Sequence, residues 1–186
     1  MKSVPKEPEV RRKKVTQLEK AGIHPYPSKS HRTATCGDVL EHFAAWHKEE
    51  RVLTLAGRVM ATRLHGGLLF VDLKDAFGKI QIQLKEDLLK NSFVQFRDYV
   101  DPGDFIEATG TLIETKRKEK TLLISSWQML SKAVLPLPEK WHGLMDVEQR
   151  FRKRYLDLLL NEDVRDRMLA RSKIISAIRA LLDAKG

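Results

Sequence analysis

The strongest constraint on the fold is a period-2 pattern of apolar residues between positions 57 and 87. In the segment LLFVDLK, 68–74, every second residue is a leucine or valine, which gives one apolar face to a strand. The opposite face carries Phe70 together with Asp72 and Lys74. An aromatic side chain is therefore predicted on the face that meets solvent.

The next segment, KIQIQLK at 79–85, alternates more regularly. Its isoleucines and leucine are predicted to face a core, whereas Gln81, Gln83 and Lys85 face outward. If the two strands pair across the turn DAFG, these amides lie beside Phe70. An aromatic ring beside hydrogen-bonding amides is typical of proteins that bind single-stranded nucleic acid.

Strand patterns occur in five segments, and a helical pattern at about 86–98 lies between the third and the fourth. The predicted strands are 52–62, 67–74, 79–85, 104–114 and 121–130. This order indicates an all-β core over 51–132, a five-stranded OB-fold barrel, within a chain that is α+β overall. Small barrels of this kind bind oligonucleotides on the face of strands 2 and 3, where Phe70 and Gln81 lie.

Helical patterns flank the predicted barrel. The N-terminal segment 1–50 carries a basic helix and then a second helix, for which Thr35 is the predicted N-cap and Asp38 the capping-box acid. A linker containing prolines at 133–145 precedes a helical tail at 146–186.

The charge balance favours a polyanionic partner. Lysine and arginine total 34 against 25 acidic residues, a net charge of +9. Nucleic acid satisfies this balance, and so does an acidic membrane surface. In the first helix, Arg11, Arg12, Lys13 and Lys14 form a basic run. The run is interpreted equally well as a solvated surface or as a set of phosphate contacts.

Several other kinds of chemistry are not predicted. Cys36 is the single cysteine, so intramolecular disulfides and cysteine-rich zinc sites are excluded, and the six histidines lack the spacing of a metal site. No nucleophile with a neighbouring base is recognisable, and Asp72 and Asp75 are interpreted as turn-forming residues. The sequence shows neither a membrane-spanning run nor a signal peptide, so we expect no membrane association and a cytoplasmic protein.

With these residues in view, the chain resembles the N-terminal part of class II lysyl-tRNA synthetases. The resemblance runs from about Val10 to Gly186, in the family's order and spacing. It is carried by LAGRVMATR, FVDLKDAFGKIQ, PLPEKWHGL, RFRKRYLDLL and RSKIISAIRALLDAKG. The first two segments also resemble the aspartyl and asparaginyl relatives, whereas PLPEKWHGL and RYLDL are characteristic of the lysine enzymes.

This resemblance implies that the barrel binds the anticodon stem-loop of tRNA(Lys). Phe70 matches the family's stacking phenylalanine, Gln81 the glutamine that reads a base edge, and Arg63 the arginine beside them. The family's glutamate that reads another base aligns with Thr121. Glu119 is the alternative for that role if the loop is reshaped.

The resemblance also implies a parent reaction, the ATP-dependent ligation of lysine to tRNA with Mg²⁺, by a homodimer. Residues 146–186 match the start of the class II catalytic domain, while the motifs that bind ATP lie beyond the chain. We therefore expect no cofactor, no metal and no catalytic residue in this chain, and no activity from it alone. Two alternatives stay open: a standalone OB-fold module that binds nucleic acid, and a regulatory partner of a synthetase.

Overall fold

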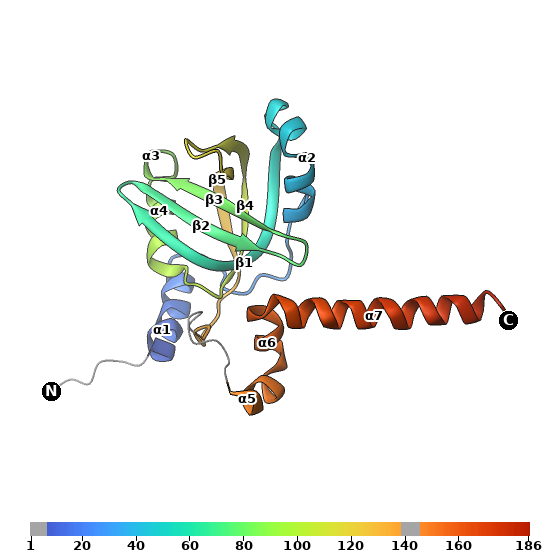
Figure 1. Ribbon diagram of the computed structural model, residues 1–186. Helices are drawn as coiled ribbons and strands as arrows, with labels where there is room; N and C mark the ends of the chain where they lie inside the picture. Colours follow the sequence, from blue (N-terminus) through green and yellow to red (C-terminus); the bar gives the residue numbers. More distant parts are fainter. Residues whose placement is uncertain (1–6, 139–145) are drawn as a thin grey trace. The chain divides into compact units, whose positions relative to one another are not determined.

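A closed five-stranded barrel forms the centre of the first of two units (Figure 1). The computed structural model describes residues 7–138 and 146–186. The barrel unit ends at Leu137, and the helical unit begins at Pro138. Within the predicted linker and the N-terminal segment, residues 139–145 and 1–6 lie outside the described residues.

The barrel closes in the order β1-β2-β3-β5-β4, with antiparallel pairs except for the parallel pair β3–β5. Its strands are β1 Val52–His65, β2 Leu68–Lys74, β3 Lys79–Lys85, β4 Phe105–Glu114 and β5 Lys120–Ser131. The predicted OB-fold is confirmed. Strand β1 is longer than predicted because it stays paired with β2 up to the turn at Gly66, where φ is +58°.

The predicted alternation places the core correctly. On β2, Leu69, Val71 and Leu73 are at most 4% exposed, and the apolar residues of β3 are equally buried. Phe93 and Phe96 add their rings to the same core from the helical insert. That insert is two helices rather than one, α3 Glu86–Leu89 and α4 Asn91–Tyr99. The break falls at Lys90, whose φ of 49° no right-handed α-helix accommodates.

Helix α2, Cys36–Lys48, begins at the predicted capping box. The Thr35 hydroxyl accepts from the Asp38 backbone N–H, and the Asp38 carboxylate accepts from the Thr35 backbone N–H. Asp75 then ties this helix to the β2–β3 turn. One of its carboxylate oxygens accepts from the Cys36 N–H at 2.8 Å, and the other accepts from the N–H groups of Phe77 and Gly78. The interpretation of Asp75 as a turn-forming residue is confirmed.

Helix α1, Glu7–Lys20, is attached to the barrel through a buried ion cluster. In this cluster the Lys132 ammonium lies between Asp101 and Asp104, and its Nζ is 2.7 Å from Asp104 Oδ2. The Lys14 ammonium of α1 joins it at 2.7 Å from Asp101 Oδ1. Burial alone would raise the pKa of Asp101, but the hydrogen bonds from Lys132 and Lys14 outweigh it and hold that pKa below its usual range.

The helical unit contains α5 Val147–Arg152, α6 Arg154–Leu160 and α7 Glu162–Asp183. A fully buried carboxylate, Asp157, joins them by accepting from Arg150 at 2.9 Å, Arg154 at 2.7 Å and Asn161 at 2.6 Å. Within the described ranges, none of the helices combines the length and apolarity needed to cross a bilayer.

Candidate nucleic-acid interface

Three neighbouring strands bring three of the predicted base-binding residues, Arg63, Phe70 and Gln81, onto one outer face of the barrel. The register places Phe70 of β2 opposite Arg63 of β1 on one side and Gln83 of β3 on the other. Two residues further along β2, Asp72 pairs across the sheet with Gln81. Directly opposite side chains in such pairs are in contact range. The name β2–β3 face is used below for the surface formed by Phe70 and Asp72 of β2, Lys79, Gln81 and Gln83 of β3, and the neighbouring Arg63 of β1.

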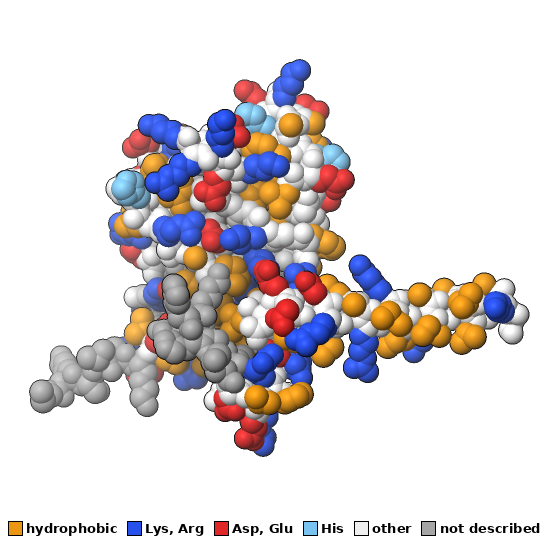
Figure 2. Space-filling view, viewed as in Figure 1, with side chains coloured by type: hydrophobic (Ala, Val, Ile, Leu, Met, Phe, Trp, Pro, Cys, Tyr) orange, Lys and Arg blue, Asp and Glu red, His pale blue; other side chains and the backbone are white. Residues whose placement is uncertain are grey.

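Basic side chains surround this face. On the barrel surface shown in Figure 2, Lys and Arg lie among hydrophobic side chains and a few acidic ones. Phe70 itself is half-buried and points away from the core, because its neighbours Leu69 and Val71 occupy the inner side of the strand. A ring supported at its edges and open on the outside is suited to stacking with a base.

The glutamines of β3 are more enclosed than predicted. Gln81 is 8% and Gln83 7% exposed, although both point away from the core as expected. The reason is the position of β3 between β2 and β5, whose side chains crowd it from both sides. Gln81 therefore offers a limited, oriented part of its amide rather than a freely moving side chain.

Thr121 contacts Gln81 from inside the barrel wall and is not exposed at the surface. The parallel pairing of β3 with β5 places the two residues opposite each other, and Thr121 is fully buried. Its hydroxyl lies 3.1 Å from Gln81 Oε1 and 3.1 Å from the backbone oxygen of Glu119, so its single proton is shared between these two acceptors. Thr121 thus lies behind Gln81 and not at the surface, and its predicted part in base binding stays a prediction. The contact uses only the oxygen of the Gln81 amide, so its NH₂ group still carries donors for a base edge.

Glu119 is exposed in the turn that precedes β5, close to the same face. The pKa of Arg63 is raised, mainly by its hydrogen bond to Asp72. The Glu119 carboxylate lies near enough to add a smaller contribution to this rise. Of the two candidates for the second base contact, Glu119 is the one whose side chain reaches solvent.

Arg63 does not project freely from the barrel. Its guanidinium binds Asp72 through two contacts, Nη2–Oδ1 at 2.7 Å and Nη1–Oδ2 at 3.4 Å. Burial would raise the pKa of Asp72, but Arg63 and Lys79 outweigh this effect and lower it. The interpretation of Asp72 as a turn-forming residue missed this role. Its place on the same strand face as Phe70 was the available signal.

The basic run of α1 divides into two pairs. Arg12 and Lys13 are exposed and available to a phosphate. Arg11 is 5% exposed and donates to the carbonyl of Pro102 at 2.9 Å, while Lys14 binds Asp101. Arg11 and Lys14 are therefore engaged in holding α1 on the barrel, and the phosphate contacts of the basic run stay a prediction.

Other chemical features of the described residues offer no second site of this kind. Over 7–138 and 146–186, no three His, Cys, Asp or Glu side chains come together as metal ligands. Burial raises the pKa of Cys36 to about 12, so the thiol stays protonated and is a poor nucleophile.

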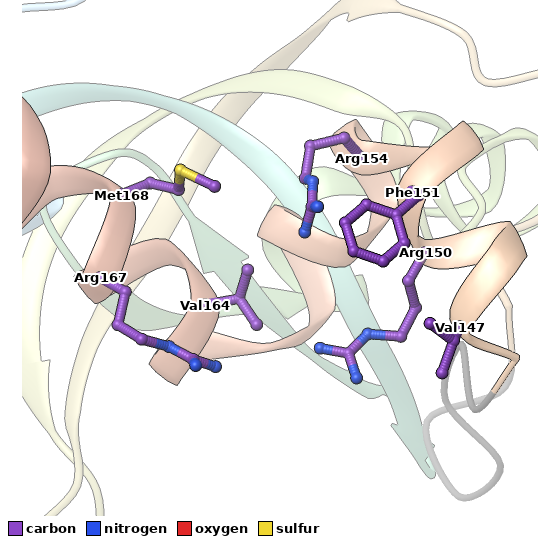
Figure 3. Close-up of a pocket in the computed structure, with 7 residues that line it drawn as sticks. All are labelled: Val147, Arg150, Phe151, Arg154, Val164, Arg167 and Met168. Atoms are coloured by element: carbon purple, nitrogen blue, oxygen red, sulfur yellow. The ribbon is translucent and has the colours of Figure 1, made fainter.

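A pocket of about 330 Å³ lies within the helical unit. Its lining residues are Val147, Arg150, Phe151, Arg154, Val164, Arg167 and Met168. Figure 3 shows Arg154 beside the ring of Phe151, with 4.8 Å between its guanidinium carbon and the ring centre. The arginines already pair with carboxylates, Arg150 and Arg154 with Asp157 and Arg167 with Asp163. We assign no ligand to this pocket.

Comparison with known proteins identifies the barrel and its relatives. Residues 53–130 match the family model of the OB-fold nucleic acid binding domain. The chain is 42% identical over 177 residues to a lysine–tRNA ligase of Carboxydothermus hydrogenoformans, an alignment that covers 95% of this chain and 36% of that protein. The ligase of Roseiflexus sp. strain RS-1 is 44% identical over 175 residues, with 93% and 36% covered. That of Methanoculleus marisnigri is 42% identical over 172 residues, with 91% and 34% covered. The chain thus spans about a third of the length of these curated relatives.

Proposed function

Because this chain is homologous to lysine–tRNA ligases over nearly its whole length, we propose that its barrel binds the anticodon of tRNA(Lys) on the β2–β3 face. The observation that carries the proposal is the position of Phe70. Its ring lies on the outer side of an OB-fold barrel, between Arg63 and Gln83 and next to the Asp72–Gln81 pair. Such a grouping of ring, guanidinium and amide is what recognition of an unstacked base requires.

Each residue of the face has a distinct part in this proposal. A base stacks on Phe70, and the NH₂ group of Gln81 donates to an acceptor on a base edge while Thr121 holds the amide in place. Arg63 offers its remaining N–H groups to a phosphate or a base edge. Glu119 accepts from a second base, and Arg12 and Lys13 attract the phosphates of the stem.

We propose the parent activity from the relatives. They are lysine–tRNA ligases, so the full reaction would join lysine to tRNA(Lys). As a further part of the proposal, this reaction would use ATP with Mg²⁺ and be carried out in the cytoplasm by a homodimer. In that scheme residues 51–132 recognise the tRNA, and residues 146–186 belong to the start of the catalytic domain. ATP and Mg²⁺ would bind outside the residues of this chain.

The test is binding of RNA stem-loops to the purified chain, measured by fluorescence anisotropy. Phe70→Ala should weaken binding of the tRNA(Lys) anticodon stem-loop about fivefold or more, because stacking on one aromatic ring contributes about 1–3 kcal/mol per base. The matched control is Leu88→Ala, which removes another exposed apolar side chain, 58% exposed on α3, and should leave binding unchanged.

Two results would count against the proposal. Unchanged affinity of Phe70→Ala, with the fold intact by circular dichroism, would remove Phe70 from the site. Equal binding of tRNA(Lys) and aspartate-tRNA stem-loops by the wild-type chain would refute the lysine assignment and favour a general nucleic-acid module.

A further inference from the structure

A carboxylate lies in the middle of the proposed RNA-binding face. Asp72 is two residues from Phe70 on the same side of β2, and it pairs across the sheet with Gln81. Its side chain is 15% exposed, so its charge is felt at the surface. A negative charge at this position offsets part of the attraction that Arg63 and Lys79 exert on phosphate, and so lowers the affinity for any nucleic acid. Its presence on a face that binds RNA therefore calls for a specific role.

The contacts of Asp72 suggest what that role is. Both of its oxygens bind the Arg63 guanidinium, at 2.7 and 3.4 Å, and Lys79 Nζ lies 3.6 Å from Oδ2. A guanidinium held by two carboxylate oxygens is fixed in plane and direction. Without this partner, an arginine whose side chain is 52% exposed would sample many rotamers. Asp72 thus determines where Arg63 points, next to Phe70.

We propose that Asp72 is a positioning and selectivity residue of this face, an inference that rests on the function proposed above. It holds Arg63 in one orientation beside the stacked base. It also repels the RNA backbone from the strip between Phe70 and Gln81, so that a base, rather than a phosphate, occupies that strip. Asp72 therefore lowers the total affinity for RNA and raises the part of the affinity that depends on the base.

The two effects give Asp72→Asn an unusual signature. The asparagine has nearly the same shape but no charge, so repulsion of phosphate disappears and Arg63 loses its two-point ionic partner. Affinity for an RNA that lacks the base should rise, while discrimination between intact and abasic RNA should fall. Replacing a residue that merely supports the fold would instead lower the affinity for abasic RNA and the discrimination together.

The experiment measures binding of the full 186-residue chain to the tRNA(Lys) anticodon stem-loop and to versions with one abasic anticodon nucleotide each. Discrimination is the ratio of the affinities for intact and abasic RNA. The wild-type chain should show a ratio of about 5 or more at one anticodon position. Asp72→Asn should reduce that ratio at least about threefold and raise the affinity for abasic RNA about threefold at low salt. The rise should vanish at high salt, where charges are screened.

Asp98→Asn is the matched control. It makes the same change of net charge in the barrel unit, and its carboxylate also binds an arginine, Arg97, at 2.8 Å, but it lies on α4. Its discrimination ratio should equal that of the wild-type chain. Arg63→Gln is the second variant, and it should lose discrimination without a rise in affinity for abasic RNA, because the charge of Asp72 stays in place.

Three results would overturn the inference while leaving base recognition in place. The first is a discrimination ratio of Asp72→Asn equal to that of the wild-type chain. The second is an equal loss of affinity of Asp72→Asn for intact and for abasic RNA. If Asp72→Asn does not fold, the test passes to Arg63→Gln. The third refuting result is a discrimination ratio in Arg63→Gln equal to that of the wild-type chain. A wild-type chain that binds intact and abasic RNA equally would instead refute base recognition itself, and the inference with it.

Discussion

Replacing Lys132 with methionine should destabilise the barrel unit more than the loss of a surface charge can explain. The Lys132 side chain and that of Asp104 are both fully buried, and Asp101 beside them is 19% exposed. Methionine fills most of the space of the lysine stem, so little packing is lost. The substitution therefore leaves buried carboxylates without their central cation.

The magnitude follows from the partners that remain. Removing one partner of a buried ion pair costs about 3–5 kcal/mol, because the remaining charge stays desolvated and unpaired. Asp104 would keep two hydrogen bonds, from the N–H groups of Asp101 and Ala133, each at 2.8 Å. Asp101 would keep Lys14 at 2.7 Å. We therefore expect a loss of about 3 kcal/mol, at the lower end of that range.

The assay is urea unfolding followed by tryptophan fluorescence, since Trp46 and Trp127 both pack against the barrel core. Lys116→Met, at an exposed position in the β4–β5 turn, is the control and should change the free energy of unfolding by less than about 0.5 kcal/mol. Adding Asp104→Asn to Lys132→Met should restore part of the loss, since it removes the unpaired charge. A loss below about 1 kcal/mol in Lys132→Met would refute the claim that this cation neutralises buried carboxylates.

Three further predictions concern the barrel unit. Gly110→Ala should cost about 3 kcal/mol or more of unfolding free energy, because its Cβ would lie 2.0 Å from a backbone oxygen of β5. Gly67→Ala is the control, because its added Cβ would first meet the flexible end of a glutamate side chain at 3.2 Å. An equal loss of unfolding free energy in Gly67→Ala would contradict the explanation by a backbone clash. Cys36, with its pKa raised to about 12 by burial, should be alkylated by iodoacetamide at pH 8 only as the barrel opens, and mass spectrometry showing rapid labelling of the native chain would contradict this. Since the pKa of Asp101 is lowered in the folded chain, its contribution to stability is complete above the unfolded value of about 3.9 and is lost as the pH falls through the folded value. Urea titrations between pH 5 and 2 should therefore show that the unfolding free energy of Asp101→Asn falls less steeply with pH than that of the wild-type chain. Equal pH dependence in the two proteins would show that Asp101 is not the source of this loss.

Local sequence patterns were sufficient for the parts of the fold that depend on local chemistry. The period-2 pattern of 68–74 predicted which residues of β2 are buried, and the spacing of Thr35 and Asp38 predicted the start of α2. The same pattern placed Phe70 on the outer face, next to Arg63 in the paired sheet. These predictions succeeded because the strand period and the capping box are set by residues close together in the sequence.

Features that depend on distant partners could not be predicted in the same way. The basic run of α1 does not reveal that Arg11 donates to a carbonyl 91 residues away, or that Lys14 binds Asp101. The burial of Gln81 depends on the parallel pairing of β3 with β5, which brings Thr121 against it across 40 residues of sequence. Charge and periodicity describe a residue's own strand or helix, whereas these contacts follow from barrel closure.

The parallel pair β3–β5 has a consequence for how the protein matures. Pairing two segments so far apart in the chain requires closing a long loop first, so we expect this pair to form late in folding. The amide of Gln81 gains its Thr121 partner only in that step. On the function proposed above, a chain that has collapsed without closing its barrel would carry the same charges and attract RNA, but it would not distinguish one base from another. On the proposed function, base discrimination is therefore acquired only once β3 and β5 have paired, and its loss should be an early sign of an imperfectly folded molecule.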